Sequence, residues 1–407
     1  MKIDHIKDLI QSCNINFLIG SGCSVPYLST LHNIENLLTD LDNQKAIKPK
    51  NLDLIKASIY KVYCEDVIFK NLNSFILTKG KEGEEIQDEK YSNVLNDYKK
   101  LLLGLNEILL YKHNTLQSKQ VNLFTTNIDL FLEKALEETR LEANDGFKGR
   151  IKPTYDLSNF HKSYSKTSSH YDNISEIPVF NLLKVHGSIN WKNENKNILA
   201  CNTLEKVETV KKKLDELSSK NIFLKIDEES TISILIAEAE KIKEKDIPEF
   251  SELFDAYNHL LIVNPTKSKF EKTLFDEQFY ELLRIFANSL EKENTLLFVL
   301  GFSFADEHIR DITIRAANSN PTLQVIIFAH KNEDGENISK ELQFDMQNVR
   351  NNNIIIITPE KFIDSNSNKD EIAPILADRL VNFDCETITT EIFNKVKDTI
   401  RLNKKRT

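Results

Sequence analysis

Cysteine, glycine and tryptophan are scarce in this sequence. The 407 residues include five cysteines, ten glycines and one tryptophan. No two cysteines lie within four residues of each other, so the chain has no CxxC pair and no zinc-ribbon spacing. An odd, scattered set of cysteines favours a reducing compartment over a disulfide framework. We therefore expect a cytoplasmic protein that has no metal site and binds no zinc.

Long apolar runs and excess basic charge are also absent. No apolar run approaches the roughly 20 residues that a membrane span needs, and Asp4 and Asp8 interrupt the pattern of a signal peptide. The net charge is −9 and the isoelectric point is near 5.6. The short basic run at 401–406 is typical of a solvated tail. We expect no membrane partner and no direct nucleic-acid binding.

Short apolar segments alternate with helical patterns over much of the chain. Hydrophobic residues make up 40% of the sequence, enough for a sizeable core. Alternation of buried strands and helices predicts a Rossmann-like, doubly wound parallel α/β sheet. The expected strands are 15–19, 121–126, 179–185, 260–263, 296–300, 323–328 and 354–357. The expected helices of this part are 1–12, 130–138, 271–290, 306–318 and 338–348.

Two stretches interrupt this alternation. Residues 31–113 show helical periodicity with an exposed loop at 79–85, and 192–258 are highly charged and mostly helical. The span 145–177 is polar and predicted to be loop. The predicted division is a core of 1–30, 114–191 and 259–365, a helical insertion at 31–113, a charged helical insertion or lid at 192–258, and a C-terminal helical segment and basic tail at 366–407.

The first predicted strand runs directly into a turn with two glycines, Gly20 and Gly22. Glycine permits a tight turn and a close approach of backbone to a ligand. Ser21 and Ser24 are small enough to leave this approach open, and Ser24 can cap a following helix. Exposed backbone N–H groups at a helix start bind phosphate. A plain strand-to-helix turn remains an alternative, because the dinucleotide fingerprint requires a third glycine.

Three other predicted strands end in unusual polar segments: 125–129, 186–188 and 301–306. Each segment has a structural alternative, since Asn127 or Asp129 can cap a helix and His186 can be a structural histidine. Ligands of doubly wound sheets bind at the carboxyl ends of strands. Four such segments on one edge therefore favour a shared site over four unrelated turns.

These four segments, in this order, resemble the NAD-binding core of the sirtuins. Gly20–Ser24 resembles the GAGxS loop of that family, and Thr126–Asp129 resembles its QNID segment with threonine in place of glutamine. Lys184–Ser188 resembles the strand that ends in the catalytic HG pair, and Gly301–Ser303 resembles the GTS turn. The sequences TTNID and GFSFADEHIR are typical of the bacterial sirtuin-like branch of antiphage systems.

The departures from the family pattern concern acyl-peptide chemistry. Deacylase sirtuins carry a PDFR segment after the first loop, which Pro26–Ser29 does not match, and a four-cysteine zinc module, which this sequence cannot build. The resemblance therefore implies an NAD+ hydrolase, in which NAD+ is a consumed substrate, rather than a protein deacylase.

The resemblance also implies roles for individual residues. Asn127 would orient the ribose hydroxyls or the attacking water, and Asp129 would bind the carboxamide of nicotinamide or fix Asn127. His186 would be the general base. The residues that would bind NAD+ are Gly20, Ser21, Gly22, Ser24, Thr126, Gly301, Phe302 and Ser303.

The function implied by the resemblance is depletion of NAD+ in bacterial antiphage defence. The trigger would lie in a partner, for which this branch suggests a HerA-type ATPase, and we expect a homo-oligomer. Two alternatives stay open. The chain could bind NAD+ or ADP-ribose and regulate an assembly without turnover, or it could process nucleic acid with an ATPase. Acidic charge and the lack of a metal-binding carboxylate cluster disfavour the nucleic-acid alternative.

Overall fold

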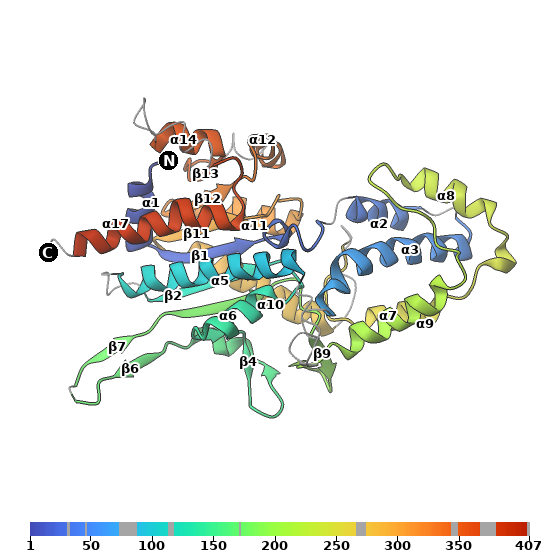
Figure 1. Ribbon diagram of the computed structural model, residues 1–407, viewed down its shortest axis with the longest axis horizontal. Helices are drawn as coiled ribbons and strands as arrows, with labels where there is room; N and C mark the ends of the chain where they lie inside the picture. Colours follow the sequence, from blue (N-terminus) through green and yellow to red (C-terminus); the bar gives the residue numbers. More distant parts are fainter. Residues whose placement is uncertain are drawn as a thin grey trace.

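The computed structural model describes residues 1–30, 33–44, 47–72, 88–112, 118–170, 172–265, 274–342, 349–366 and 380–404. Its centre is a seven-stranded parallel sheet with the order β13-β12-β11-β1-β2-β8-β3 (Figure 1). The strands are β1 (Asn14–Ile19), β2 (Gln120–Thr125), β3 (Ala143–Asn144), β8 (Val179–Lys184), β11 (Thr295–Leu300), β12 (Leu323–Phe328) and β13 (Ile354–Ile357). The predicted α/β class with a doubly wound parallel sheet is confirmed.

The strands on the two sides of β1 come from different parts of the chain. From β1 the chain adds β2, β3 and β8 on one side, with β8 between β2 and β3, and it later returns to place β11, β12 and β13 on the other side. The switch point of the sheet therefore lies between β1 and β11. Ligands of doubly wound sheets bind at such a point, outside the carboxyl ends of the strands.

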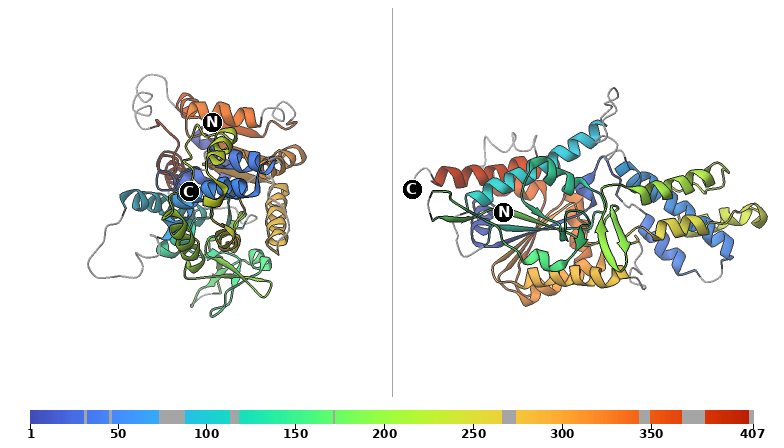
Figure 2. Two further views of the ribbon diagram at one scale, coloured as in Figure 1. Left: turned by 90° about the vertical axis from the view of Figure 1, so that its right-hand side faces the viewer. Right: turned by 90° about the horizontal axis from the view of Figure 1, so that it is seen from below.

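Helices cover both faces of the sheet, which explains why β8 and β11 are buried along their whole length (Figure 2). Alternate residues of β1 enter different cores, with Phe17 on one face and Leu18 on the other. The helices of the Phe17 face are α1 (Ile3–Ser12), α5 (Glu89–Leu110), α6 (Phe131–Thr139), α14 (Pro359–Asn366), α16 (Cys385–Ile388) and α17 (Asn394–Lys404). Those of the Leu18 face are α10 (Leu274–Glu291), α11 (Glu307–Ser319) and α12 (Asn332–Glu341).

A ladder of three asparagines, two buried and one half-buried, crosses the sheet near the amino ends of its strands. Asn16, Asn122 and Asn181 stand opposite one another in β1, β2 and β8. The Asn122 amide donates to Asn16 Oδ1 at 2.8 Å, and the Asn181 amide donates to Asn122 Oδ1 at 2.8 Å. A one-residue slip of any strand would leave these polar groups unpaired in the core, so the ladder specifies the register.

The first part of the insertion predicted at 31–113, residues 33–44 and 47–72, packs with the insertion predicted at 192–258 into one helical lobe at the end of the molecule (Figures 1 and 2). The prediction was wrong for the last part of 31–113, because α5 packs on the central sheet. The core of this lobe also includes Ile128, Leu130 and Ile189, which follow β2 and β8. The lobe therefore sits on the carboxyl edge of the sheet. Its helices are α2 (Ile34–Asp42), α3 (Pro49–Tyr63), α7 (Glu205–Ser218), α8 (Ile232–Lys241) and α9 (Ser251–Asn258).

Short strands occupy the segment that was expected to be loop, and they also begin the second insertion. The two-stranded hairpin of β6 and β7 extends away from the sheet (Figure 1). A separate four-stranded sheet has the order β4-β5-β10-β9. The bounds are β4 (Phe147–Lys148), β5 (Thr154–Tyr155), β6 (Ser165–Thr167), β7 (Ile174–Glu176), β9 (Trp191–Glu194) and β10 (Asn197–Ala200).

Two further predictions of local structure were wrong. Residues 260–263 are not a strand of the sheet, because Ile262 makes a single antiparallel bridge with Gly187 and packs into the helical lobe. The helix expected at 338–348 begins earlier, as α12 at Asn332, and 343–348 lie outside the described residues. The loop at 79–85 and the end of the basic tail, 405–407, lie outside them too. No helix in the described parts is long and apolar enough to cross a membrane.

Candidate functional site

The four predicted segments follow four adjacent strands. Ile19 pairs with Leu300 on one side and with Thr125 on the other, and Thr125 pairs with Lys184. The carboxyl ends of β11, β1, β2 and β8 therefore lie in one row, which includes the switch point. Segments that are far apart in the sequence meet at the edge where the fold places a ligand.

The turns after β1 and β11 are packed against each other through glycines. The Gly20 N–H donates to the Leu300 carbonyl at 2.9 Å, and the Gly22 N–H donates to the Gly301 carbonyl at 3.0 Å. A Cβ atom on Gly20 would lie 2.4 Å from the Gly301 oxygen. Gly301 has φ +59°, and a Cβ atom there would lie 2.5 Å from the Cys23 nitrogen. Neither position can hold a side chain, so the two turns require glycine at their contact.

The glycine turn continues as a short 3₁₀ helix, η1 (Ser21–Ser24). Ser21 and Gly22 are exposed, whereas Gly20 is buried. The N–H groups at the start of such a helix have no partner within the helix. The Gly22 N–H donates to the Gly301 carbonyl, so the N–H group that remains at the start of η1 is that of Ser21. The prediction that Ser24 caps a following helix was wrong, since Ser24 is the last residue of η1.

Ser24 instead connects the glycine turn to the segment after β2. Its hydroxyl donates to Asp129 Oδ2 at 2.8 Å and lies 3.1 Å from the Tyr98 hydroxyl. The other oxygen of Asp129, Oδ1, accepts from the Phe131 N–H at 3.1 Å, at the start of α6. Burial raises the pKa of Asp129, and the nearby Lys184 ammonium partly opposes this. Asp129 was expected either to bind the carboxamide of nicotinamide or to fix Asn127. This geometry favours the second role, because the carboxylate holds Ser24, which in turn contacts Asn127.

Asn127 lies directly against the glycine turn and is 7% exposed. Its side-chain amide donates to the Gly20 carbonyl at 3.1 Å and to the Ser24 hydroxyl at 3.3 Å. Both partners act as acceptors here, because Ser24 gives its own proton to Asp129, so the amide can have only one orientation. The remaining atom, Oδ1, is buried and has no hydrogen-bond partner among the described residues. Buried acceptors are rarely unpaired in proteins, so Oδ1 is a natural contact for a bound ligand or water.

His186 follows β8, and its side chain is 13% exposed. Its Nε2 atom lies 2.9 Å from Oδ2 of Asp306, which is 8% exposed. The other oxygen of Asp306 accepts from the backbone N–H groups of His308 and Ile309, at 3.0 and 3.3 Å, and so caps α11. The sequence reasoning missed Asp306 as a site residue, although it belongs to the predicted 301–306 segment. An acidic residue just before a helix was the available signal.

The remaining predicted residues lie on the same edge. Ser303 is exposed, and Phe302 and Thr126 are half-buried. The Phe302 ring contacts that of Phe304 with 5.1 Å between centroids. The Thr126 N–H donates to the Ile19 carbonyl at 3.3 Å, which connects this residue to the end of β1.

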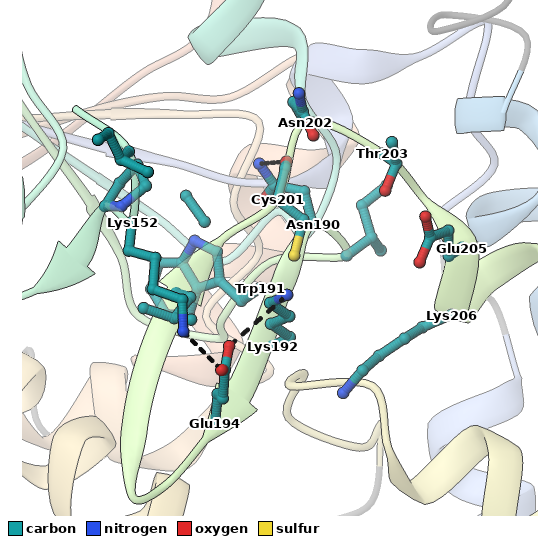
Figure 3. Close-up of a pocket in the computed structure, with 15 residues that line it drawn as sticks. Lys152, Asn190, Trp191, Lys192, Glu194, Cys201, Asn202, Thr203, Glu205 and Lys206 are labelled. Carbon is teal, nitrogen blue, oxygen red and sulfur yellow. Dashed lines mark hydrogen bonds and ion pairs between the residues drawn. The ribbon is translucent and has the colours of Figure 1, made fainter. Parts of the chain in front are cut away.

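A cavity of about 300 Å³ lies next to this edge, between the four-stranded sheet and the start of α7 (Figure 3). Ile189 and Asn190, which follow the Gly187–Ser188 turn, contribute to its wall, but none of the predicted site residues does. Glu194 forms ion pairs there with Lys152 at 2.7 Å and with Lys192 at 3.8 Å. The cavity therefore has mixed polarity, with cationic and anionic side chains in its wall.

Residues 261–357 match the family model of a SIR2-like domain. The match supports a sirtuin-like family. The matched part of the chain contains β11, β12 and β13 as well as Asp306, but it does not extend to Asn127 or His186. Among curated proteins, none matches the chain.

A SIR2-like domain implies NAD+ binding and an NAD-dependent class of enzyme. The edge of the sheet fits such a ligand in two respects. The exposed Ser21 lies beside the contact between Gly20 and Gly301, where no side chain fits. Asn127 Oδ1 is a buried acceptor that has no partner among the described residues. Within the described residues, no group of three or more histidine, cysteine, aspartate or glutamate side chains could hold a metal ion.

Proposed function

We propose that this protein is an NAD+ glycohydrolase, which converts NAD+ and water into nicotinamide, ADP-ribose and a proton. The observation that carries the proposal is the arrangement at the switch point. Asn127 offers an unpaired oxygen against the glycine turn, and His186 lies on the same row of strand ends, held by Asp306. The SIR2-like domain supports NAD+ as the ligand.

Some of the site residues would bind NAD+, and others would orient the nucleophile and accept its proton. Ser21 and Ser303 are exposed on the two turns that flank the switch point, where they can contact phosphate and ribose. The fixed Oδ1 of Asn127 can accept from a ribose hydroxyl or from the attacking water, which orients it. His186 can take the proton that this water or hydroxyl loses. NAD+ supplies the labile bond between nicotinamide and ribose.

Hydrolysis accounts for the chain better than deacylation does. A deacylase would need an acyl-peptide channel, and the sequence lacks the cysteines and the PDFR segment that accompany one in the family it resembles. The segment after Ser188 forms the β9–β10 hairpin and then α7. Water as the acceptor requires no such channel.

The biological setting that we propose is the cytoplasm of a bacterium under phage attack, with NAD+ depletion as the effector step. A HerA-type ATPase as partner and a homo-oligomeric state belong to the same proposal. They rest on the likeness of TTNID and GFSFADEHIR to the antiphage branch. The exposed surfaces of the helical lobe are available for such contacts.

The decisive experiment follows the products. The purified protein is incubated with NAD+, alone and with the candidate ATPase, and free nicotinamide and ADP-ribose are separated by chromatography. Asn127→Ala should abolish most of the release, whereas Asn193→Ala, a matched change on the exposed part of β9, should not. Calorimetric binding of NAD+ without products under both conditions would instead favour a regulatory subunit that binds NAD+ or ADP-ribose.

A further inference from the structure

The contact between His186 and Asp306 joins two ends of the candidate site. His186 follows β8, and Asp306 is the N-cap residue of α11, which follows β11; β1 and β2 lie between these strands in the sheet. The two side chains nevertheless approach to 2.9 Å, and both are largely buried. Because 120 residues separate them in the sequence, only the sheet topology brings them together.

The orientation of the Asp306 carboxylate is set by α11. Oδ1 accepts the backbone N–H groups of His308 and Ile309, so Oδ2 is the atom that faces His186. Backbone donors at a helix N-terminus stabilise a negative carboxylate. An ionised carboxylate can only accept hydrogen bonds, so the Nε2 atom of His186 must carry the proton of this contact.

The tautomer of His186 follows from that assignment. A neutral imidazole has one N–H and one bare nitrogen, so a proton on Nε2 leaves Nδ1 as the acceptor. Within the described residues, no group forms a hydrogen bond with Nδ1, and the imidazole lies near the Phe279 ring, with 6.0 Å between centroids. Nδ1 is therefore the basic atom of the site.

We propose that Asp306 is a positioning residue that holds His186 in the Nε2–H tautomer, so that Nδ1 is the atom that accepts the proton during catalysis. This assignment rests on the proposed function for its catalytic meaning. It adds a residue that acts through His186 and identifies the reacting nitrogen. Asp306 also caps α11, so the same carboxylate connects the stability of that helix to the state of the base.

Asp306→Asn separates the two roles of the residue. Asparagine is a good N-cap, and its oxygen can still accept from His308. Its NH₂ group would then face Nε2, which must lose its proton to accept, so the proton moves to Nδ1 and the base is blocked. In a well-studied catalytic triad the same exchange lowers kcat by about 10⁴-fold. Here we expect a loss of at least about 1,000-fold in kcat with little change in KM.

The control for the exchange is Asp384→Asn. Asp384 caps α16 by accepting from the Thr387 N–H at 2.7 Å, and α16 packs on the other face of the sheet. This variant undergoes the same chemical change at a helix N-cap and should keep the turnover of the wild type.

The test reads the tautomer directly. Protein labelled with ¹⁵N in histidine is studied by long-range ¹H–¹⁵N NMR above pH 8, and His186→Gln assigns the signal. The expected result is Nε2–H in the wild type and Nδ1–H in Asp306→Asn. A wild-type proton on Nδ1, or wild-type kcat in Asp306→Asn, would overturn the proposal.

The NMR measurement also separates two kinds of failure. If the wild type releases no nicotinamide under either condition, the proposed function fails and the assignment of a base fails with it, whatever the NMR shows. If the wild type is active but its NMR spectrum shows Nδ1–H, NAD+ hydrolysis stands and only the role of Asp306 is lost.

Discussion

Gly301→Ala tests the contact between the two turns at the switch point. The residue has φ +59°, a conformation that costs an L-residue about 1–2 kcal/mol. The new Cβ atom would also lie 2.5 Å from the Cys23 nitrogen and 2.9 Å from the Gly22 carbonyl carbon, both of them backbone atoms. Such overpacking typically costs about 1–3 kcal/mol. Together these terms predict that the free energy of unfolding falls by about 2–5 kcal/mol.

Gly104→Ala is the matched control, because it makes the same chemical change in the buried interior of α5. Its added Cβ atom would meet only Asn394 Oδ1, at an ordinary contact distance of 3.5 Å. Replacing a helical glycine by alanine stabilises by about 0.5–1 kcal/mol. The two variants should therefore move the free energy of unfolding in opposite directions.

Urea denaturation, followed by circular dichroism and by fluorescence of the single tryptophan, measures both changes. Trp191 is 4% exposed, so its emission should shift when the fold opens. The reasoning is refuted if Gly301→Ala unfolds at the same urea concentration as the wild type. It is refuted as well if Gly104→Ala is destabilised to the same extent, because the effect would then not be specific to the site.

Three further predictions concern the site and one half-buried carboxyl group, that of Asp97. Asn127→Ala and His186→Ala should each lower NAD+ turnover by roughly 100-fold or more, measured as nicotinamide release, because each removes a positioned group; near-wild-type rates would exclude the role. Gly22→Val should abolish NAD+ binding in calorimetry, since even its Cβ atom would lie 2.9 Å from the Gly301 Cα and the valine would cover the turn; normal affinity would contradict the assignment of the turn. Burial, and secondly the Glu386 carboxylate, raise the pKa of Asp97 to about 6. Because the pKa is higher in the folded state, the ionised Asp97 carboxylate lowers the free energy of unfolding progressively as pH rises from about 4 to 6. Asp97→Asn should therefore raise the free energy of unfolding, measured by urea denaturation, by about 1–2 kcal/mol at pH 7 and leave it unchanged below pH 4. An equal gain at both pH values would exclude this cause.

The helical lobe has a direct connection to the site. Ile128 stands between Asn127 and Asp129 in the sequence, and Ile189 follows Ser188, and both side chains are buried in the core of the lobe. The backbone on either side of the candidate catalytic residues is thus attached to helices of both insertions. A partner that binds the lobe would therefore act on elements continuous with the site.

Local pattern was sufficient for six of the seven strands of the sheet and for the positions of most site residues, but it missed the two-residue strand β3. The strands β8 and β11 are apolar along their whole length, which only a sheet covered on both faces explains, and parallel strands place their carboxyl ends on one edge. Asn127 and His186 could thus be placed at a common edge without coordinates. The segment 260–263 has the same apolar character, but Leu260 and Ile262 enter the core of the lobe while Leu261 and Val263 pack against the core of the Leu18 face. Periodicity does not reveal which core an apolar segment enters.

The sequence by itself determined the class of fold and the edge on which the polar segments gather, since both follow from repeating local patterns. Only the tertiary structure decided that Ser24 holds Asp129 rather than a helix end, that Asn127 keeps an unpaired oxygen, and that Asp306 reaches His186. The physical reason is that these contacts join residues more than one hundred positions apart. Strand order and the packing of two turns set such distances, and no local pattern encodes them.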